Sequence, residues 1–169
     1  MRIPITTATG IGETNLAAFD NALTNAGIEN RNLIRLSSVV PPNTEIDIVE
    51  APFEDTPGGW GDRLYVVYAD QRASKVGEEA WAGIGWVQDP TDNKGLFVEH
   101  EGPSEHSVTS DIKFSLNGLL KNRNIEGSDW RRGQEVVGIE CTESGLAVCA
   151  LAVAMYQASD WNNVPYLLR

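Results

Sequence analysis

Apolar side chains recur at helical spacing in two segments of the chain. In residues 14–26 the apolar positions are Leu16, Phe19, Leu23 and Ala26. Thr14 is a suitable N-cap, because its hydroxyl can accept a hydrogen bond from the first turn, and Gly27 stands just past the end. The second segment, residues 104–121, has Ser104 as its candidate N-cap. Its apolar face consists of Val108, Ile112, Leu116, Leu119 and Leu120. Both patterns predict helices.

Short runs rich in β-branched and aromatic residues lie between Gly, Pro and Asn, a pattern typical of strands. The predicted strands cover residues 2–9, 46–49, 63–69, 78–87, 95–101 and 134–141. Gly10 and Gly12 predict a flexible turn from the first strand into the first helix. Residues 146–156 are almost wholly apolar, which suits a central strand covered on both faces but leaves a buried helix as an open alternative.

The apolar run of residues 32–40 ends at two consecutive prolines, Pro41 and Pro42. Proline fixes its own φ and holds the preceding residue extended, so this run is predicted to be a strand that ends in a rigid exposed turn. Two helices separated by runs of strands are typical of an α+β layered sandwich. We predict a single domain spanning residues 1–169, which is long enough to bury a core without disulfides.

The acidic composition narrows the range of partners. A formal net charge of −11 repels nucleic acid and anionic lipid, and it favours a cationic small-molecule substrate. The two cysteines, Cys141 and Cys149, are interpreted as buried thiols, although a disulfide across a hairpin stays open. The N-terminus lacks a signal peptide and no apolar run is long enough to span a membrane, so a cytoplasmic protein is expected.

Two weak motifs favour their structural interpretations. Residues 10–14 superficially resemble a phosphate loop, but they have neither the third glycine of a dinucleotide fingerprint nor the lysine of a P-loop. His100 and His106 stand among three glutamates at a spacing that matches no named ligand pattern, so no metal site is predicted.

Ser37 and Ser38 would be two small polar residues at the end of a strand were it not for their surroundings. The segment Asn-Ala-Gly-Ile-Glu-Asn-Arg-Asn-Leu-Ile-Arg-Leu-Ser-Ser-Val-Val-Pro-Pro, residues 25–42, resembles the self-cleavage region of pyruvoyl-dependent arginine decarboxylases. The likeness extends upstream to Gly12-Glu13-Thr14 and Ala18-Phe19-Asp20, and it returns at Val98-Glu99-His100-Glu101-Gly102. It is dense over residues 10–46 and weak outside these motifs.

The resemblance implies a fold, a cofactor and an assembly. The family has a four-layer αββα sandwich, and its chains form trimers that are sometimes paired into hexamers, with sites at subunit interfaces. Self-cleavage between Ser37 and Ser38 would give a small chain, residues 1–37, and a larger chain, residues 38–169. Ser38 would become the covalent pyruvoyl group, an electron sink that replaces pyridoxal phosphate. Each site would draw Ser38 from one subunit and Asp20 or Glu99 from its neighbour.

The same resemblance assigns roles to three further residues. Glu99 is expected to reprotonate the carbanion left by decarboxylation, which near neutral pH requires a pKa raised by burial or by a nearby carboxylate such as Glu101. Asn32 is expected to hydrogen-bond near the pyruvoyl group, and Asp20 to pair with the guanidinium of the substrate. The implied reaction is the decarboxylation of L-arginine to agmatine and carbon dioxide.

Two alternatives to arginine decarboxylation stay open from the sequence. The first keeps the mechanism but acts on another amino acid or amine-bearing substrate, because a change of substrate would alter the surroundings of Asp20. The second is an uncleaved, non-enzymatic trimeric scaffold in which Ser38 stays a serine.

Overall fold

The computed structural model describes residues 1–126 and 129–166. The predicted domain of residues 1–169 also includes residues 127–128 and 167–169, which lie outside the described residues. Within the described residues the chain forms two helices and ten strands, a mixed α+β fold as predicted. The helices are α1 (Asn15–Ala26) and α2 (Glu105–Asn122). Neither of these helices combines the length and the apolar character needed to cross a membrane.

The strands form two sheets. The six-stranded sheet contains β1 (Arg2–Gly12), β2 (Asn32–Arg35), β4 (Glu45–Ile48), β5 (Arg63–Ala73), β9 (Ala147–Ser159) and β10 (Pro165–Tyr166). Its order is β2-β5-β9-β1-β4, with β10 paired to the end of β9. The four-stranded sheet contains β3 (Val39–Val40), β6 (Glu79–Gln88), β7 (Gly95–Gly102) and β8 (Arg131–Glu140), in the order β3-β7-β6-β8.

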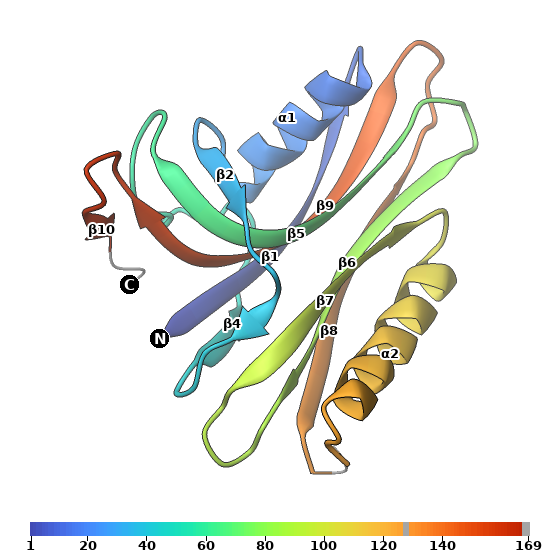
Figure 1. Ribbon diagram of the computed structural model, residues 1–169. Helices are drawn as coiled ribbons and strands as arrows, with labels where there is room; N and C mark the ends of the chain where they lie inside the picture. Colours follow the sequence, from blue (N-terminus) through green and yellow to red (C-terminus); the bar gives the residue numbers. More distant parts are fainter. Residues whose placement is uncertain (127–128, 167–169) are drawn as a thin grey trace.

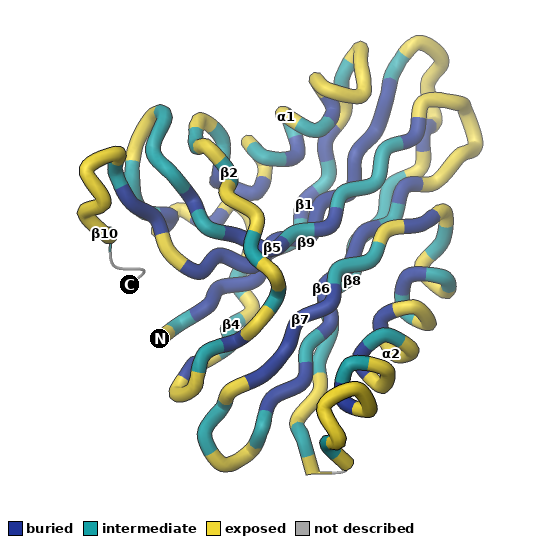
Figure 2. The backbone as a smooth tube through the Cα atoms, viewed as in Figure 1, coloured by how far each residue is buried: buried dark blue, intermediate teal, exposed yellow. Residues whose placement is uncertain are grey.

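The two sheets pack face to face, and each helix covers the outer face of one sheet (Figure 1). Alternate residues of β9 point to opposite sides, as the period of a strand requires. Leu151 and Val153 belong to the core cluster beneath α1, whereas Ala152 and Ala154 belong to the cluster between the sheets. Strand β9 is accordingly buried along most of its length (Figure 2). The prediction of a central strand covered on both faces is confirmed, and the buried-helix alternative is wrong.

The caps of both helices are confirmed. The Thr14 hydroxyl accepts a hydrogen bond from the Ala17 amide, and Gly27 ends α1 in the left-handed conformation with φ 79°. The Ser104 hydroxyl caps α2 in the same way as Thr14 caps α1, accepting from the amide of Ser107. The predicted apolar face of α2 is also confirmed, because Val108, Ile112, Leu116 and Leu120 are buried.

The prediction for the region of Gly10 and Gly12 is wrong. Strand β1 continues to Gly12, so both glycines lie in the strand and not in a turn. A Cβ added at Gly10 would lie 2.2 Å from the backbone oxygen of Ala18, so the glycine is needed for the close approach of α1 to β1. This close approach also explains why the buried face of α1 consists of Ala18, Ala22 and Ala26, whereas Leu16 is 70% exposed.

The prediction of one strand over residues 32–40 is also wrong. The run divides into β2, at the edge of the six-stranded sheet, and β3, at the edge of the four-stranded sheet. Residues 36–38 belong to neither strand. A turn at Pro42 and Asn43 follows β3 after one residue, Pro41, as predicted. The predicted cleavage site therefore lies where the chain changes sheets.

Candidate active site

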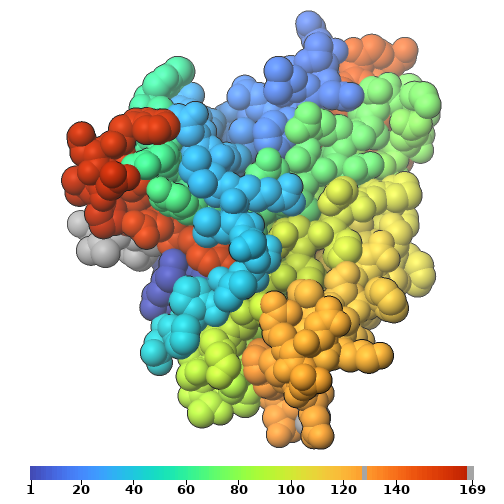
Figure 3. All heavy atoms as spheres, viewed as in Figure 1, coloured from blue at the N-terminus to red at the C-terminus, as the bar shows by residue number. Residues whose placement is uncertain are grey.

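The segment of residues 36–44 crosses from one sheet to the other and is called the crossing segment below. At its start the Leu36 amide donates a hydrogen bond of 2.8 Å to the Val66 carbonyl in the six-stranded sheet. Two residues later the Ser38 carbonyl accepts one of 2.8 Å from the Phe97 amide in the four-stranded sheet. The space-filling view shows the crossing segment, in blue to cyan, on the surface of the molecule (Figure 3). Ser37, between the two anchors, is exposed.

Ser38 has a backbone conformation that serines rarely adopt. Its φ is 66°, in the left-handed region. For a residue with a Cβ this conformation costs about 1 to 2 kcal/mol, because the Cβ comes too close to the following carbonyl oxygen. The Ser38 hydroxyl donates a hydrogen bond of 2.6 Å to Oε1 of Glu99 on β7. The two residues are 61 positions apart in the chain, and the fold brings them together.

The electrostatic surroundings of Glu99 favour its protonated form. Burial raises the pKa of the Glu99 carboxyl above its usual value, and the nearby charge of Glu101 adds to this effect. The hydrogen bond from Ser38 and the positive charges of Arg35 and His100 act in the opposite direction without cancelling the shift. The pKa of the Glu99 carboxyl is therefore shifted upward, the direction that a proton donor requires, with burial as the main cause.

Tyr156 binds the backbone of the crossing segment through its hydroxyl. Its hydroxyl donates a hydrogen bond of 3.1 Å to the Val39 carbonyl, and its ring meets the Phe97 ring edge-on with the ring centres 6.1 Å apart. Burial raises the pKa of the Tyr156 phenol, so the hydroxyl stays protonated and remains a donor in the neutral range.

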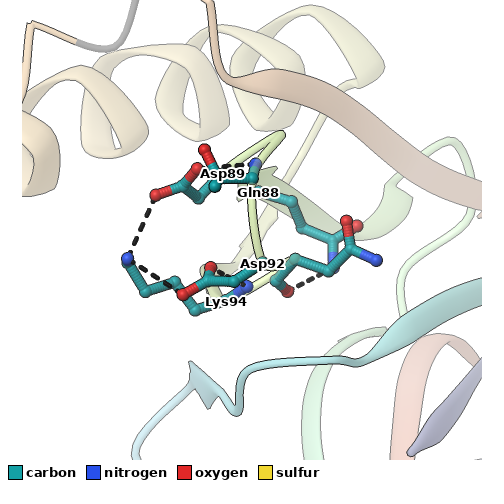
Figure 4. A network of polar contacts seen from close by, with 6 residues as sticks. Gln88, Asp89, Asp92 and Lys94 are labelled. Atoms are coloured by element: carbon teal, nitrogen blue, oxygen red, sulfur yellow. Dashed lines mark hydrogen bonds and ion pairs between the residues drawn. The ribbon is translucent and has the colours of Figure 1, made fainter.

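The loop between β6 and β7, whose internal polar contacts are drawn in Figure 4, fixes the far end of the crossing segment. The side chain of Gln88 donates to the Thr44 carbonyl at 3.0 Å, and the Asn43 amide donates to the Asp92 carbonyl at 2.6 Å. Lys94 forms ion pairs with the carboxylates of Asp89 and Asp92, which keeps the loop closed. The acidic residues of this loop therefore have a structural partner, and the loop fixes the segment downstream of the prolines.

The side chain of Asn32 binds the backbone at Gly61 and not Ser38. Its side-chain amide donates a hydrogen bond of 2.7 Å to the Gly61 carbonyl, which also accepts one of 2.9 Å from the Trp161 indole. Asn32 lies at the start of β2, on the edge of the six-stranded sheet, whereas Glu99 lies on β7 of the other sheet. In the part of the chain that the structure describes, Asn32 forms no hydrogen bond with Ser38 or Glu99.

Asp20 is exposed on α1, on the outer side of the six-stranded sheet. The neighbouring Phe19 ring lies 4.4 Å from the Arg72 guanidinium and 6.3 Å from the Tyr68 ring, and Arg35 covers Tyr68 at 4.8 Å. Phe19, the residue before Asp20, thus belongs to a row of stacked cations and rings. Within one chain the fold brings Ser38 and Glu99 together and leaves Asp20 and Asn32 apart from them.

The two histidines and the two cysteines of the chain lie outside this arrangement. His100 Nε2 lies 2.8 Å from the Ser115 hydroxyl of α2, and His106 is exposed. Across the residues that the structure describes, no three His, Cys, Asp or Glu side chains come together as a metal site requires. Cys141 and Cys149 are both buried and free, which confirms their interpretation as buried thiols.

Comparison with known proteins shows the family to which this chain belongs. The sequence model of the family described as pyruvoyl-dependent arginine decarboxylase matches residues 2–160. This chain belongs to the pyruvoyl-dependent arginine decarboxylase family. The match includes both serines, Glu99 and the whole crossing segment, so the resemblance of the short motifs extends over almost the full chain.

Relatives in this family span nearly the same length. The pyruvoyl-dependent arginine decarboxylase of Halobacterium salinarum is 31% identical over 163 residues, which cover 94% of this chain and 96% of the relative. The protein of the same name from Methanocaldococcus jannaschii is 39% identical over 152 residues, covering 85% of this chain and 81% of the relative. That from Thermococcus kodakarensis is 39% identical over 149 residues, covering 88% and 89%.

Sequence reasoning missed three groups that surround Ser38. The Tyr156 hydroxyl and the Phe97 amide bind consecutive carbonyls of the crossing segment, and Arg35 lies within electrostatic range of Glu99. Tyr156 and Phe97 stand in apolar strands where their pattern indicates core residues only. No local signal distinguishes them, because their polar contacts are made across the two sheets.

Proposed function

We propose that this chain is a self-cleaving decarboxylase that converts L-arginine to agmatine and carbon dioxide. The observation that carries the proposal is the left-handed Ser38 with its hydroxyl on Glu99, 2.6 Å apart, in a chain of the pyruvoyl-dependent arginine decarboxylase family. The names of the relatives support arginine as the substrate. The net charge of −11 is in keeping with a cationic substrate.

The residues around Ser38 fit a pyruvoyl group formed in place. That group would retain the Ser38 carbonyl, which the Phe97 amide already binds, and Glu99 would face the position that the hydroxyl now occupies. When present, the group supplies a ketone beside an amide carbonyl, an electron sink for the electron pair left by departing carbon dioxide.

Glu99 is placed to start the cleavage as a base. It takes the proton from the Ser38 hydroxyl while Oγ attacks the carbonyl carbon of Ser37. The bond between that carbon and the Ser38 nitrogen breaks, the nitrogen takes a proton, and an ester links the two residues. Loss of the α-hydrogen of residue 38 as a proton then breaks the Cβ–Oγ bond. Ser37 departs as a carboxylate, and the dehydroalanine left at position 38 takes up one water and releases ammonia.

The same carboxyl acts in the opposite direction during turnover. The upward shift of its pKa favours the protonated form of Glu99, which would deliver the proton to the α-carbon of the substrate after carbon dioxide leaves. The Phe97 amide, fixed in β7, offers a hydrogen bond where negative charge develops on the Ser38 carbonyl. One carboxyl therefore serves maturation in its ionised form and decarboxylation in its protonated form.

We further propose the finer features of the assembled protein. A four-layer αββα sandwich is supported by the two helices on the outer faces of two packed sheets. A homotrimer, single or paired, is supported by the separation of Asp20 and Asn32 from Ser38, since a neighbouring copy can bring them to the site. Because Ser38 and Glu99 meet within one chain, the neighbour would supply Asp20 and Asn32 and not Glu99. The two free thiols support a cytoplasmic location.

The division of the single domain into residues 1–37 and 38–169 is part of this proposal. Its test is carbon dioxide release measured across the amino acids with purified wild type and with Ser38→Ala. Release from arginine by wild type alone is expected. Release from a different amino acid only would favour the first alternative, in which the mechanism is kept and the substrate changes. Release by Ser38→Ala at the wild-type rate, or an uncleaved inactive wild type, would contradict the proposal.

A further inference from the structure

Two successive carbonyls of the crossing segment are held by donors from two different sheets. The Ser38 carbonyl accepts from the Phe97 amide of the four-stranded sheet at 2.8 Å. The Val39 carbonyl accepts from the Tyr156 hydroxyl of β9, the central strand of the six-stranded sheet, at 3.1 Å. Together these bonds fix the two peptide groups that follow the left-handed Ser38.

The Tyr156 side chain is a rigid donor. It is only 6% exposed, and the Phe97 ring packs against it edge-on at an angle of 76°. Phe97 thus binds the Ser38 carbonyl through its backbone and positions the Tyr156 ring through its side chain. The hydroxyl has little freedom to follow the Val39 carbonyl if that carbonyl moves.

The left-handed conformation of Ser38 depends on where the next peptide is held. A rotation of Ser38 toward an ordinary backbone conformation would swing its side chain relative to the chain that follows. With the Val39 carbonyl bound to Tyr156, such a rotation breaks a hydrogen bond as well as the contact between Ser38 and Glu99. The Tyr156 bond therefore opposes relaxation of the strained serine.

We propose that Tyr156 is a positioning residue for self-cleavage: its hydroxyl holds the Val39 carbonyl and thereby keeps Ser38 in the conformation from which Oγ reaches the Ser37 carbonyl. The inference rests on the proposed self-cleavage and adds a residue to it. Tyr156 acts through the backbone of Val39 and takes no proton in the reaction.

A cavity beside Tyr156 explains why packing alone cannot replace this bond. The cavity has a volume of about 430 Å³, and its lining includes Leu36 and Pro41 on either side of the cleavage site, together with Tyr65 and Tyr156. When the hydroxyl is absent, a water molecule in this cavity, which Tyr156 lines, can bind the Val39 carbonyl in its place. The fold is then retained while the carbonyl is no longer fixed in position.

The test compares Tyr156→Phe with the matched control Tyr65→Phe. Tyr65 is partly buried and lines the same cavity, so both variants remove one phenol hydroxyl from the same neighbourhood. Each full-length chain is made by cell-free synthesis, and the conversion to two fragments is followed by mass spectrometry under denaturing conditions. We expect at least a tenfold slower cleavage for Tyr156→Phe, about 1.4 kcal/mol in the barrier, and less than a twofold change for Tyr65→Phe.

Two readouts separate positioning from a loss of stability. Hydroxylamine cleaves the ester intermediate, so the fraction of chain that it traps early in the reaction should fall in Tyr156→Phe along with the overall rate. The pH midpoint of cleavage, which Glu99 sets, should stay where it is in wild type. The thermal midpoint of both precursor variants should match that of the wild-type precursor within a few degrees.

The outcomes distinguish this inference from the proposed function. Wild-type cleavage together with equally fast cleavage of Tyr156→Phe would overturn the role of Tyr156 and leave the function intact. Equal slowing of both variants, or slowing with a matching fall in the thermal midpoint, would also overturn it. A wild type that never cleaves would contradict the proposed function itself.

Discussion

Replacement of Glu99 by glutamine tests its role as the base of self-cleavage. Glutamine keeps an oxygen that can accept the hydrogen bond from the Ser38 hydroxyl, so the 2.6 Å contact can persist. What the variant loses is the ability to take the proton. General base catalysis contributes about 10²- to 10⁴-fold. We therefore expect cleavage of Glu99→Gln to be slower by that factor, about 3 to 5 kcal/mol in the barrier.

The pH dependence of this prediction follows from the direction of the pKa shift. Burial raises the pKa of Glu99, and the base must be ionised to take the proton of Ser38. The wild-type cleavage rate should therefore rise with pH through that raised pKa and then level off. Turnover of the mature enzyme uses the protonated form, so its rate should fall as pH rises through the pKa of the same carboxyl in the mature site.

The matched control is Glu101→Gln, two residues along the same strand. The negative charge of Glu101 adds to the raised pKa of Glu99, after the larger effect of burial. Its removal should move the pH midpoint of cleavage downward and leave the maximal rate unchanged. The assay is the rate of chain conversion, measured by mass spectrometry from about pH 4 to about pH 9, a range that brackets the ordinary glutamate value.

Three results would refute the reasoning about Glu99. The first is cleavage of Glu99→Gln at the wild-type rate. The second is a wild-type cleavage rate that decreases with pH, because the carboxyl would then act in its protonated form. The third is the same loss of maximal rate in Glu101→Gln, which would mean that the strand tolerates no change of charge.

Three further predictions follow from the same structure. Gly10→Ala should lower the free energy of unfolding by about 1 to 3 kcal/mol, because the added carbon overpacks the contact between β1 and α1. Gly118→Ala has open space around the added carbon on α2 and should raise the free energy of unfolding by about 0.5 to 1 kcal/mol. Urea titrations measure both changes. Asp20→Asn should lower kcat/KM for arginine by about 10- to 150-fold through loss of a charge-assisted bond, with normal chain cleavage, as steady-state kinetics and mass spectrometry can show. A carboxyl whose pKa is raised in the folded state contributes stability at low pH, and this contribution is lost as pH rises through that pKa. In the uncleaved Ser38→Ala precursor, Glu99→Gln should therefore become increasingly stabilising as pH rises above the ordinary pKa of glutamate. Thermal melts at several pH values measure this change.

The parts of the fold that depend on local chemistry could be predicted from the sequence. The cap at Thr14 and the terminator at Gly27 act within one turn of α1, so the pattern of a few residues is enough to locate them. The face that α1 buries depends on how closely it approaches β1. Gly10 permits that approach, and small side chains face the sheet while Leu16 stays exposed. Periodicity alone predicts that the larger apolar residues of α1 are the buried ones.

The break in the apolar run of residues 32–40 depends on distant partners. Val66 and Phe97 bind the backbone on either side of Ser37 from two separate sheets, and no property of the run itself indicates that it changes sheets. The resemblance predicts Ser38 and Glu99 in one site but leaves open whether Glu99 comes from a neighbouring subunit, and their contact within one chain, across 61 residues, was not predicted. Tyr156, 117 residues from Val39, carries no sequence signal beyond an apolar strand.

The most direct test of the central claim is the intact mass of freshly purified protein under denaturing conditions, after treatment with a carbonyl-reactive probe. We predict two fragments, residues 1–37 and 38–169, with the label on the larger one and the mass at position 38 lower than that of serine. A single unlabelled chain of 169 residues would contradict self-cleavage and favour an uncleaved scaffold.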